Sequence, residues 1–273
     1  MRRGRMTSFF ILALCLSAST AIAVPAGAGD AAARATFLRA EIARHDELYF
    51  KKAAPEISDE AYDRLKRELA ELERANGIDS KDGPVGDDRS DGFSTARHGV
   101  RMLSLQKVYT DDELAAFVKR VSADMAEKPH WIIEPKYDGI AVSAMYERGR
   151  LVRVVTRGNG IEGDDVTENA RATAAFPELL KGSGWPEKIE VRGEVYVSFA
   201  EFARVNAERA RGDADVFANP RALAAGSLKL RDVRELASRG LAVVFYGWGE
   251  VSPASARPVT QRAFHGQLAA WGL

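Results

Sequence analysis

Cysteine is almost absent from this chain of 273 residues. Cys15 is the only one, and it lies in an N-terminal segment that we expect to be removed. The mature protein would then contain no disulfide framework and no cysteine-ligated zinc site. We therefore expect burial of apolar side chains, which make up 46% of the chain, to hold the fold together.

An excess of charge is also missing, because 39 basic side chains face 39 acidic ones. Loss of Arg2, Arg3 and Arg5 with the N-terminal segment would leave three more acidic than basic side chains. Such a protein has no overall positive field that attracts nucleic acid. Any contact with DNA must therefore come from a local patch.

No apolar run is long enough to span a membrane. Residues 9–16 are apolar, but the run is short and Ser and Thr follow it. Basic residues precede it and a small-x-small pattern at 21–23 follows, which predicts a secretory signal peptide over residues 1–23. A membrane anchor is the alternative. We expect a periplasmic or secreted protein with no membrane-spanning segment in the mature chain, or a cytoplasmic one if the signal is not used.

Residues 30–92 predict a small helical domain. Two helical stripes recur at spacings of three and four, through Leu38, Ile42, His45 and Tyr49 and then through Tyr62, Leu65, Leu69 and Leu72. Ser58 is a candidate N-cap for the second helix, and Gly77 ends it. We interpret the pair as an antiparallel hairpin, followed by a linker over residues 81–92.

Residues 93–273 predict a larger domain of the α+β class, built from antiparallel sheets and helices. Thr110 and Glu113 form a capping box at the start of a helix. Residues 131–157 predict a β-hairpin around 147–150, and residues 189–197 and 241–248 predict further strands. A last helix is expected to begin near Thr260.

One short segment carries most of the chemical information. If residues 134–139 form a strand, Glu134, Lys136 and Asp138 share one face, and Gly139 permits close backbone approach. A lysine acts as a nucleophile when its neutral amine is accessible. Flanking carboxylates alone would raise its pKa, so burial, a metal ion or other cations must activate it. The alternative is a surface ion pair on an edge strand.

Four later segments are each ambiguous. Arg157, in a glycine-rich turn at 156–160, suits a phosphate or ribose hydroxyls, but an exposed turn arginine is an equal alternative. Glu190, Arg192 and Glu194 share a strand face that is more often solvated than catalytic. Residues 217–221 and 226–229 combine small residues with two cations. They could contact phosphates, or they could form an ordinary loop and the start of a helix. Residues 245–249 could stack on a base or form a core strand.

The order and spacing of these segments are specific. The family signature E-P-K-x-D-G, T-R-G-D-G, E-V-R-G-E-V, F-A-N-P-R with A-A-G-S-L, and F-x-Y-G-x-G is present in this order, with Asn159 in place of Asp and Val244 in place of the Phe of the last motif. From the helical hairpin to near its end, the chain resembles the bacterial NAD-dependent DNA ligases. In character it is closest to the signal-peptide-bearing second ligase type of some proteobacteria.

The resemblance implies a nucleotidyltransferase (adenylation) domain and a role for each matching residue. Lys136 would attack the α-phosphate of NAD, and Asp138 would orient the lysine or bind Mg²⁺. Glu134 would contact the adenine, on which Tyr246 would stack, and Arg157 and Glu194 would hold the ribose. The remaining matches are Gly139, Ser104 and Leu105 beside the nucleotide and Arg221 and Lys229 at DNA phosphates.

The helical hairpin resembles the family's site for nicotinamide mononucleotide, through Tyr49, Asp59, Tyr62 and Asp63. Two aromatic rings can sandwich a pyridinium ring, and carboxylates can accept hydrogen bonds from ribose hydroxyls. Simple packing of Tyr49 and Tyr62 between the helices is the alternative. Phe50 stands where the family usually has His.

Other family features have no counterpart here, including a D-G-V-V-x-K segment, a later lysine and the DNA-clamping domains. We therefore expect a domain that is incomplete at its C-terminus. The predicted activity is that of a monomeric NAD-dependent DNA ligase in replication and repair, using NAD and Mg²⁺ and sealing nicked double-stranded DNA. The alternative is a degenerate or truncated relative that binds NAD or adenylate without sealing DNA.

Overall fold

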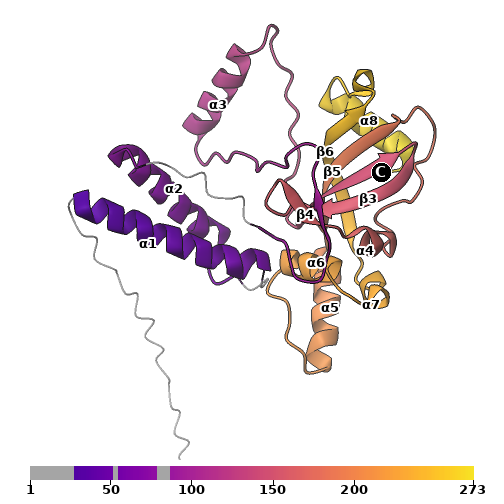
Figure 1. Ribbon diagram of the computed structural model, residues 1–273, viewed down its shortest axis with the longest axis horizontal. Coiled ribbons are helices and arrows are strands. Elements are labelled where there is room, and N and C mark those ends of the chain that lie inside the picture. The colour runs from indigo at the N-terminus through magenta and orange to yellow at the C-terminus, as the bar shows by residue number, and fades with distance from the viewer. Residues whose placement is uncertain (1–27, 52–54, 79–86) are drawn as a thin grey trace, which may run out of the picture.

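A helical hairpin forms the N-terminal part of the protein (Figure 1). The computed structural model describes residues 28–51, 55–78 and 87–273, so the predicted signal peptide lies outside the described residues. Helix α1 (Ala28–Asp46) continues into a π-helical turn, η1 (Glu47–Lys51), and α2 (Asp59–Asn76) runs back along it. Ser58 caps α2 by accepting a hydrogen bond from the amide of Ala61, and Gly77 ends it with a φ of 61°. Both predicted helix ends are confirmed.

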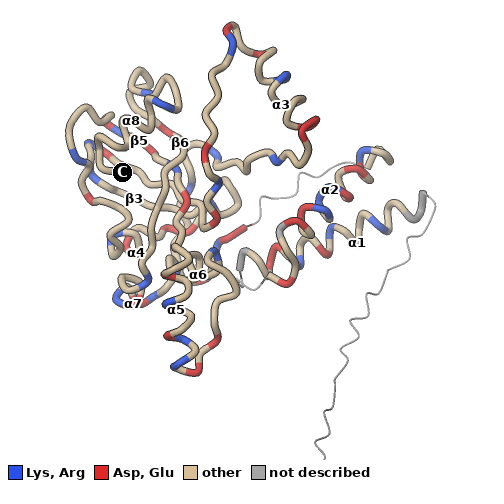
Figure 2. Tube along the Cα trace, turned by 180° about the vertical axis from the view of Figure 1, so that it is seen from behind, with Lys and Arg blue, Asp and Glu red and all other residues tan. Residues whose placement is uncertain are grey.

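Burial and ion pairs join the two helices. Leu38 and Ile42 of α1 are buried, which confirms the predicted stripe. Arg39 forms an ion pair with the buried Glu73 of α2 at 2.7 Å, and Arg34 pairs with Glu68 at 2.6 Å. Figure 2 shows the alternation of basic and acidic residues along this hairpin.

The segment after residue 86 is firmly bound to the second domain. The buried carboxylate of Asp88 accepts hydrogen bonds from Thr156 Oγ1 at 2.8 Å and from the amide of Gly158 at 3.0 Å. Strand β1 (Thr95–Arg97) pairs antiparallel with β4 (Glu162–Asp164). The prediction of a linker over 81–92 is therefore wrong for residues 88–90, because Asp88 and Ser90 are hydrogen-bonded to buried groups of the second domain. Residues 81–86 lie outside the described residues.

An antiparallel four-stranded sheet forms the core, in the order β3-β2-β5-β6. Its strands are β2 (Ile140–Glu147), β3 (Arg150–Thr156), β5 (Lys188–Tyr196) and β6 (Ala242–Ser252). Arg148 and Gly149 both have positive φ, at 47° and 75°, as a tight hairpin turn requires. The predicted hairpin turn, both later strands and the α+β class are confirmed, but the first strand of the hairpin begins at Ile140 and not at residue 131.

Helices cover the sheet and its edges (Figure 1). Helix α8 (Gln261–Trp271) buries Phe264, Leu268 and Trp271, and the Phe264 ring lies 4.9 Å from Trp248 of β6. The other elements of this domain are α4 (Thr167–Arg171), α5 (Phe199–Arg211), α6 (Pro220–Leu228), α7 (Val233–Ala237) and the 3₁₀ turn η2 (Ala254–Ala256).

Helix α3 (Asp111–Ala123) stands apart from the sheet (Figures 1 and 2). Its capping box is confirmed, because Thr110 and Glu113 exchange side chain to backbone hydrogen bonds. The helix nevertheless buries no residue. Trp131 packs on Phe117 with ring centroids 6.0 Å apart but remains 48% exposed. Residues 98–139 thus form a long excursion, which we call the α3 segment.

Candidate active site

Lys136 lies at the end of the α3 segment, directly before the core sheet. Its side chain is exposed, and the ladder between β2 and β5 begins only at Ile140 and Val195. The predicted strand placement of residues 134–138 is therefore wrong. A physical reason is Pro135, which has no amide hydrogen to donate to a ladder. The argument that Glu134, Lys136 and Asp138 share a strand face consequently fails.

Gly139 joins Lys136 to the sheet and needs to be glycine. A Cβ atom at this position would lie 2.0 Å from the carbonyl oxygen of Val195 and 3.2 Å from the Glu194 side chain. The predicted close backbone approach is confirmed. It holds the chain next to Lys136 directly against β5.

Glu194 of β5 is the buried carboxylate beside Lys136. Burial raises its pKa, while the positive charges of Arg221, Lys136 and Arg157 oppose that shift and Asp138 adds to it. Arg221 Nη1 donates to Asp138 Oδ1 at 3.1 Å and lies 3.8 Å from Glu194 Oε1. Arg221 thus joins Asp138 to Glu194, and Lys136 and Arg157 lie near enough for their charges to act on Glu194.

The position of Arg157 follows from the register of the sheet. Ala141 pairs with Glu194, and its carbonyl accepts the amide of Arg157 at 2.9 Å. In the turn that follows, Asn159 Oδ1 accepts the amides of Ile161 at 3.0 Å and Glu162 at 3.1 Å. An Asn oxygen therefore forms the acceptor bonds that close this turn. Arg157 is half-buried, so the alternative of an exposed turn arginine is wrong.

The charged face of β5 is not solvated. Glu190 is 1% exposed and accepts from Arg192 Nε at 2.8 Å. Arg192 also donates to the carbonyls of Val100 and Arg101. The alternative of a solvated face is therefore wrong, because the start of the α3 segment covers it. Arg192, oriented by Glu190, therefore holds the α3 segment, while Glu194 on the same face lies near Lys136.

Glu134 has partners that the sequence reasoning missed. It forms an ion pair with His265 of α8 and accepts from Gln261 Nε2 at 3.3 Å. Gln261 Nε2 also donates to the backbone oxygen of Tyr246 at 2.8 Å. The spacing of four between Gln261 and His265, directly after Thr260, near which the last helix was predicted to begin, was the available signal that both lie on one helix face. Partial desolvation of its hydroxyl, assisted by the charge of Glu194, raises the pKa of Tyr246 to about 12, while the residue as a whole remains 39% exposed.

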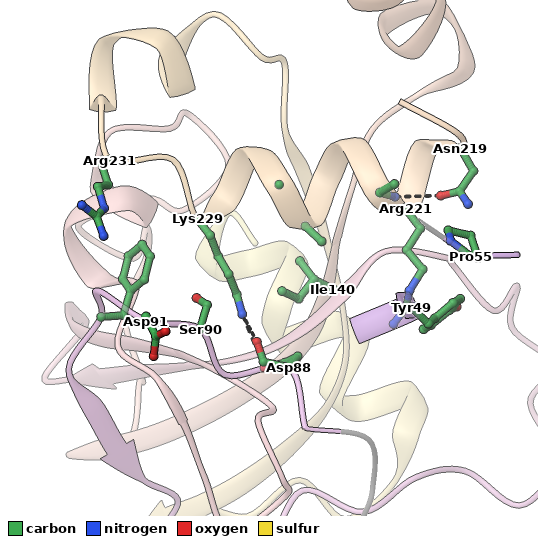
Figure 3. A pocket seen from close by; sticks show the side chains of 14 residues that line it. Tyr49, Pro55, Asp88, Ser90, Asp91, Ile140, Asn219, Arg221, Lys229 and Arg231 are labelled. Atoms are coloured by element: carbon green, nitrogen blue, oxygen red, sulfur yellow. Dashed lines mark hydrogen bonds and ion pairs between the residues drawn. The ribbon is translucent and has the colours of Figure 1, made fainter. Parts of the chain in front are cut away.

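Tyr49 faces the second domain rather than only its own hairpin. The guanidinium of Arg221 lies 4.6 Å from the centroid of its ring (Figure 3). Tyr62 instead donates its hydroxyl to Asp46 Oδ1 at 2.5 Å, and burial together with this bond raises its pKa. The packing alternative therefore describes Tyr62 better than Tyr49. The side chain of Asp59 lies outside the described residues.

Asp63 connects the hairpin to the α3 segment. Lys107 Nζ donates to its two carboxylate oxygens at 2.5 and 2.6 Å. Burial raises the pKa of Asp63, but the hydrogen bonds from Lys107 and Tyr109 outweigh it, so the pKa lies below its usual range. Ser104 and Leu105 are exposed on the same segment, and among the described residues neither forms a hydrogen bond or ion pair with Lys136, Asp138 or Glu194.

Lys229 is tied into the core. It forms an ion pair with Asp164 Oδ2 at 3.0 Å and donates to the backbone oxygen of Asp88 (Figure 3). Its side chain is 13% exposed, against 1% for Asp164. It lines a pocket of about 230 Å³ that also includes Tyr49 and Arg221 but not Lys136. This geometry favours a structural role over the predicted DNA contact.

The part of the chain that the structure describes contains no group of three or more His, Cys, Asp or Glu side chains arranged to hold a metal. Asp138 and Glu194 offer two carboxylates near Arg221. That set fits Mg²⁺, which is commonly held by one or two carboxylates, waters and substrate phosphates. No helix among the described residues has the length and apolar character needed to cross a membrane.

A helical hairpin attached to an antiparallel sheet, with a lysine beside acidic and arginine side chains, defines the class: an α+β protein with an adenylation-type domain. The family model for the NAD-dependent DNA ligase adenylation domain matches residues 90–273. The model for the DNA ligase-like, N-terminal NAD⁺-binding domain matches residues 28–84. The chain belongs to the NAD-dependent DNA ligase family.

Curated relatives carry the same name. DNA ligase 1 of Opitutus terrae is 51% identical over 253 residues, covering 89% of this chain and 37% of the relative. DNA ligase 2 of the same organism is 48% identical, covering 88% and 35%. The DNA ligase of Hyphomonas neptunium is 42% identical, covering 89% and 36%. The chain spans a little over a third of the length of these relatives.

Proposed function

We propose that this chain transfers AMP from NAD to its own Lys136. The observation that carries the proposal is the close approach of Gly139 to Val195 and Glu194, at the start of β2 and the end of β5, which places Lys136 where its charge acts on the buried Glu194 together with Arg157 and Arg221. A lysine in such surroundings lies beside cations that can neutralise a phosphate. Electrostatic stabilisation and positioning are the main demands of phosphoryl transfer.

In the proposed step, the neutral amine of Lys136 forms a bond to the α-phosphorus of NAD. The bond from that phosphorus to the bridging oxygen breaks, and nicotinamide mononucleotide leaves with the electron pair. The amine nitrogen loses its proton to solvent or to a neighbouring carboxylate, of which Asp138 is a candidate. Mg²⁺ bound near Asp138 and Glu194 would supply charge neutralisation at the phosphates.

The remaining contacts are proposed on the same basis. Glu134, held by His265, would accept from the adenine amine, and the ring of Tyr246 would stack on the base. Arg157 and Glu194 would bind the ribose, with Ser104 and Leu105 beside the nucleotide. On the hairpin, the mononucleotide half would be held by Tyr49, Asp59, Tyr62 and Asp63. This corresponds to a helical domain over residues 30–92 and an adenylation domain over 93–273.

Intact-mass measurement after incubation with NAD and Mg²⁺ tests the proposal. We expect an adduct of the size of AMP on the wild-type chain and none on Lys136→Ala. Lys128→Ala is the matched control, because Lys128 is an exposed lysine of the same segment. An unmodified wild-type chain, or an adduct that persists in Lys136→Ala, would refute the proposal.

Transfer of the AMP to the 5′-phosphate of nicked double-stranded DNA, followed by sealing, is a separate proposal. It is supported by the names of relatives of which the match covers only 37% and 35%. A nick-sealing assay with the pre-adenylylated chain tests it. An adduct without sealing would instead support the second candidate, a chain that binds NAD or adenylate but does not seal DNA.

Export to the periplasm or medium is proposed from residues 1–23. The N-terminal residue of the processed protein, determined after expression in a Gram-negative host, tests it. We expect cleavage after Ala23; an intact N-terminus in the cytoplasm would contradict export. We also propose a monomer, which light scattering can test, and roles in replication and repair.

A further inference from the structure

Arg221 occupies the place where the two halves of the site meet. One side of its guanidinium lies 4.6 Å from the ring of Tyr49, which belongs to the helical hairpin. Its Nη1 atom lies 3.1 Å from Asp138 and 3.8 Å from Glu194, which belong to the adenylation domain. Figure 3 shows the side chain extending from α6 toward Tyr49. A single side chain therefore contacts both domains.

The orientation of the Arg221 side chain is fixed by its surroundings. Asn219 caps α6 by accepting the amide of Ala222 at 2.7 Å, so Arg221 lies in the first turn of a well-defined helix. Ala222 and Leu223 next to it are buried, and the Arg221 side chain itself is only 19% exposed. Packing thus holds the guanidinium between Tyr49 and Glu194, with little of it exposed to solvent.

A dinucleotide in this site must span the same junction. Its nicotinamide half would lie at the hairpin by Tyr49, and its adenylate half must bring the α-phosphorus to Lys136. The pyrophosphate that joins the halves therefore passes between them, where the planar fork of an arginine can bind phosphate oxygens bidentately. We infer that Arg221 binds the pyrophosphate of NAD, a role that rests on the proposed function and differs from the DNA-phosphate contact implied by resemblance.

Binding of the pyrophosphate by Arg221 can be distinguished from two other roles, covering the Tyr49 ring and contacting DNA. The comparison is between NAD and ADP-ribose. ADP-ribose has the pyrophosphate but lacks the pyridinium ring. We expect Arg221→Gln to weaken the binding of both ligands by at least about tenfold, as measured by isothermal titration in the absence of DNA. Arg221→Lys, which keeps the charge but loses the fork, should recover part of this loss.

Other outcomes would overturn the inference. Tighter binding of NAD with unchanged binding of ADP-ribose would mean that Arg221 merely occupies the Tyr49 ring face in place of the pyridinium. Unchanged binding of both, with loss of affinity for nicked DNA, would assign Arg221 to DNA. If wild-type protein binds NAD and forms the lysine adduct but Arg221→Gln binds NAD equally well, this inference fails while the proposed function stands.

Arg231→Gln is the matched control. Arg231 lines the same pocket as Arg221 but lies at its other end, away from Tyr49 (Figure 3). We expect its affinities for NAD and ADP-ribose to remain within about twofold of wild type. Thermal unfolding of all variants establishes that they fold. A loss of binding in Arg231→Gln equal to that in Arg221→Gln would indicate a general effect of positive charge and would overturn the assignment.

Discussion

The core sheet and the α3 segment differ sharply in how they are held. In the sheet, Val142, Ala144 and Val191 are fully buried. In the α3 segment, the helix buries nothing and Ile133 is 97% exposed. Lys136 belongs to the loosely packed region, whereas the carboxylate and arginine beside it belong to the core. The position of Lys136 is therefore set where the two regions meet at Gly139, which we call the seam, and not by the sheet itself.

Such a division suits a site that must admit a ligand and then align it. Regions with few buried contacts open at low free-energy cost, whereas core strands open only near global unfolding. The α3 segment is attached to the sheet mainly by polar contacts, such as those of Arg192 with the carbonyls of residues 100 and 101. The predictions below test whether the two regions respond differently to equivalent changes.

The largest expected effect comes from removing a lysine of the core. Lys229→Met would leave Asp164 and Asp88 without their cation, and breaking a buried ion pair in this way costs about 3–5 kcal/mol. Chemical denaturation measures the change. Lys119→Met, at an exposed lysine of α3, is the matched control and should change stability by less than about 0.5 kcal/mol. Equal stability of the two variants would contradict the contrast between the regions.

The next effect concerns the seam. Gly139→Ala would place a Cβ atom 2.0 Å from a backbone oxygen of β5, so the chain must shift. We expect a loss of about 1–3 kcal/mol and, because a displacement of about 1 Å misaligns Lys136, a fall of about 100-fold in the rate of adduct formation. Gly247→Ala is the stability control, because a Cβ there meets nothing within 4 Å. Wild-type rates in Gly139→Ala would show that the seam does not position the lysine.

Local sequence signals were sufficient for much of the fold. The caps at Ser58 and Thr110 and the turn at Arg148 and Gly149 depend on side chains and dihedral angles within a few residues. The positions of the two later strands also followed from their patterns. These features need no knowledge of distant parts of the chain.

The remaining features depend on partners far apart in sequence. The alternation of Glu190, Arg192 and Glu194 indicates a shared face but not that residues 100 and 101 cover it. The burial of Lys229 depends on Asp88 and Asp164, and the pairing of Glu134 depends on His265. The argument that grouped Glu134, Lys136 and Asp138 fails, since a period of two applies only within a strand. Lys136 and Asp138 lie near Glu194, whereas Glu134 contacts His265.

Hydrogen exchange compares the two regions without any substitution, through strand β2 and two helices of 13 residues each. Helix α3 buries no residue, whereas α5 buries Val205. We expect the amides of β2 to be protected at least about a thousandfold more than those of α3, with α5 between them. Mass spectrometry of peptides from the three elements measures this order. Protection of α3 equal to that of β2 would show that the segment packs on the sheet in solution.

The smallest effect is spectroscopic and concerns the face of the sheet where the base is proposed to stack. Burial and the charge of Glu194 raise the pKa of Tyr246 to about 12, so its phenol should remain neutral at pH 10. Because the folded state favours the neutral form, Tyr246 should make the fold less stable as the pH rises from about 10 toward 12. The difference in ultraviolet absorbance between wild type and Tyr246→Phe isolates this titration from that of Tyr109, whose pKa is also about 12. Stacking of an adenine nucleotide should move the step to still higher pH, whereas a step near 10 that ignores the nucleotide would place Tyr246 outside the site.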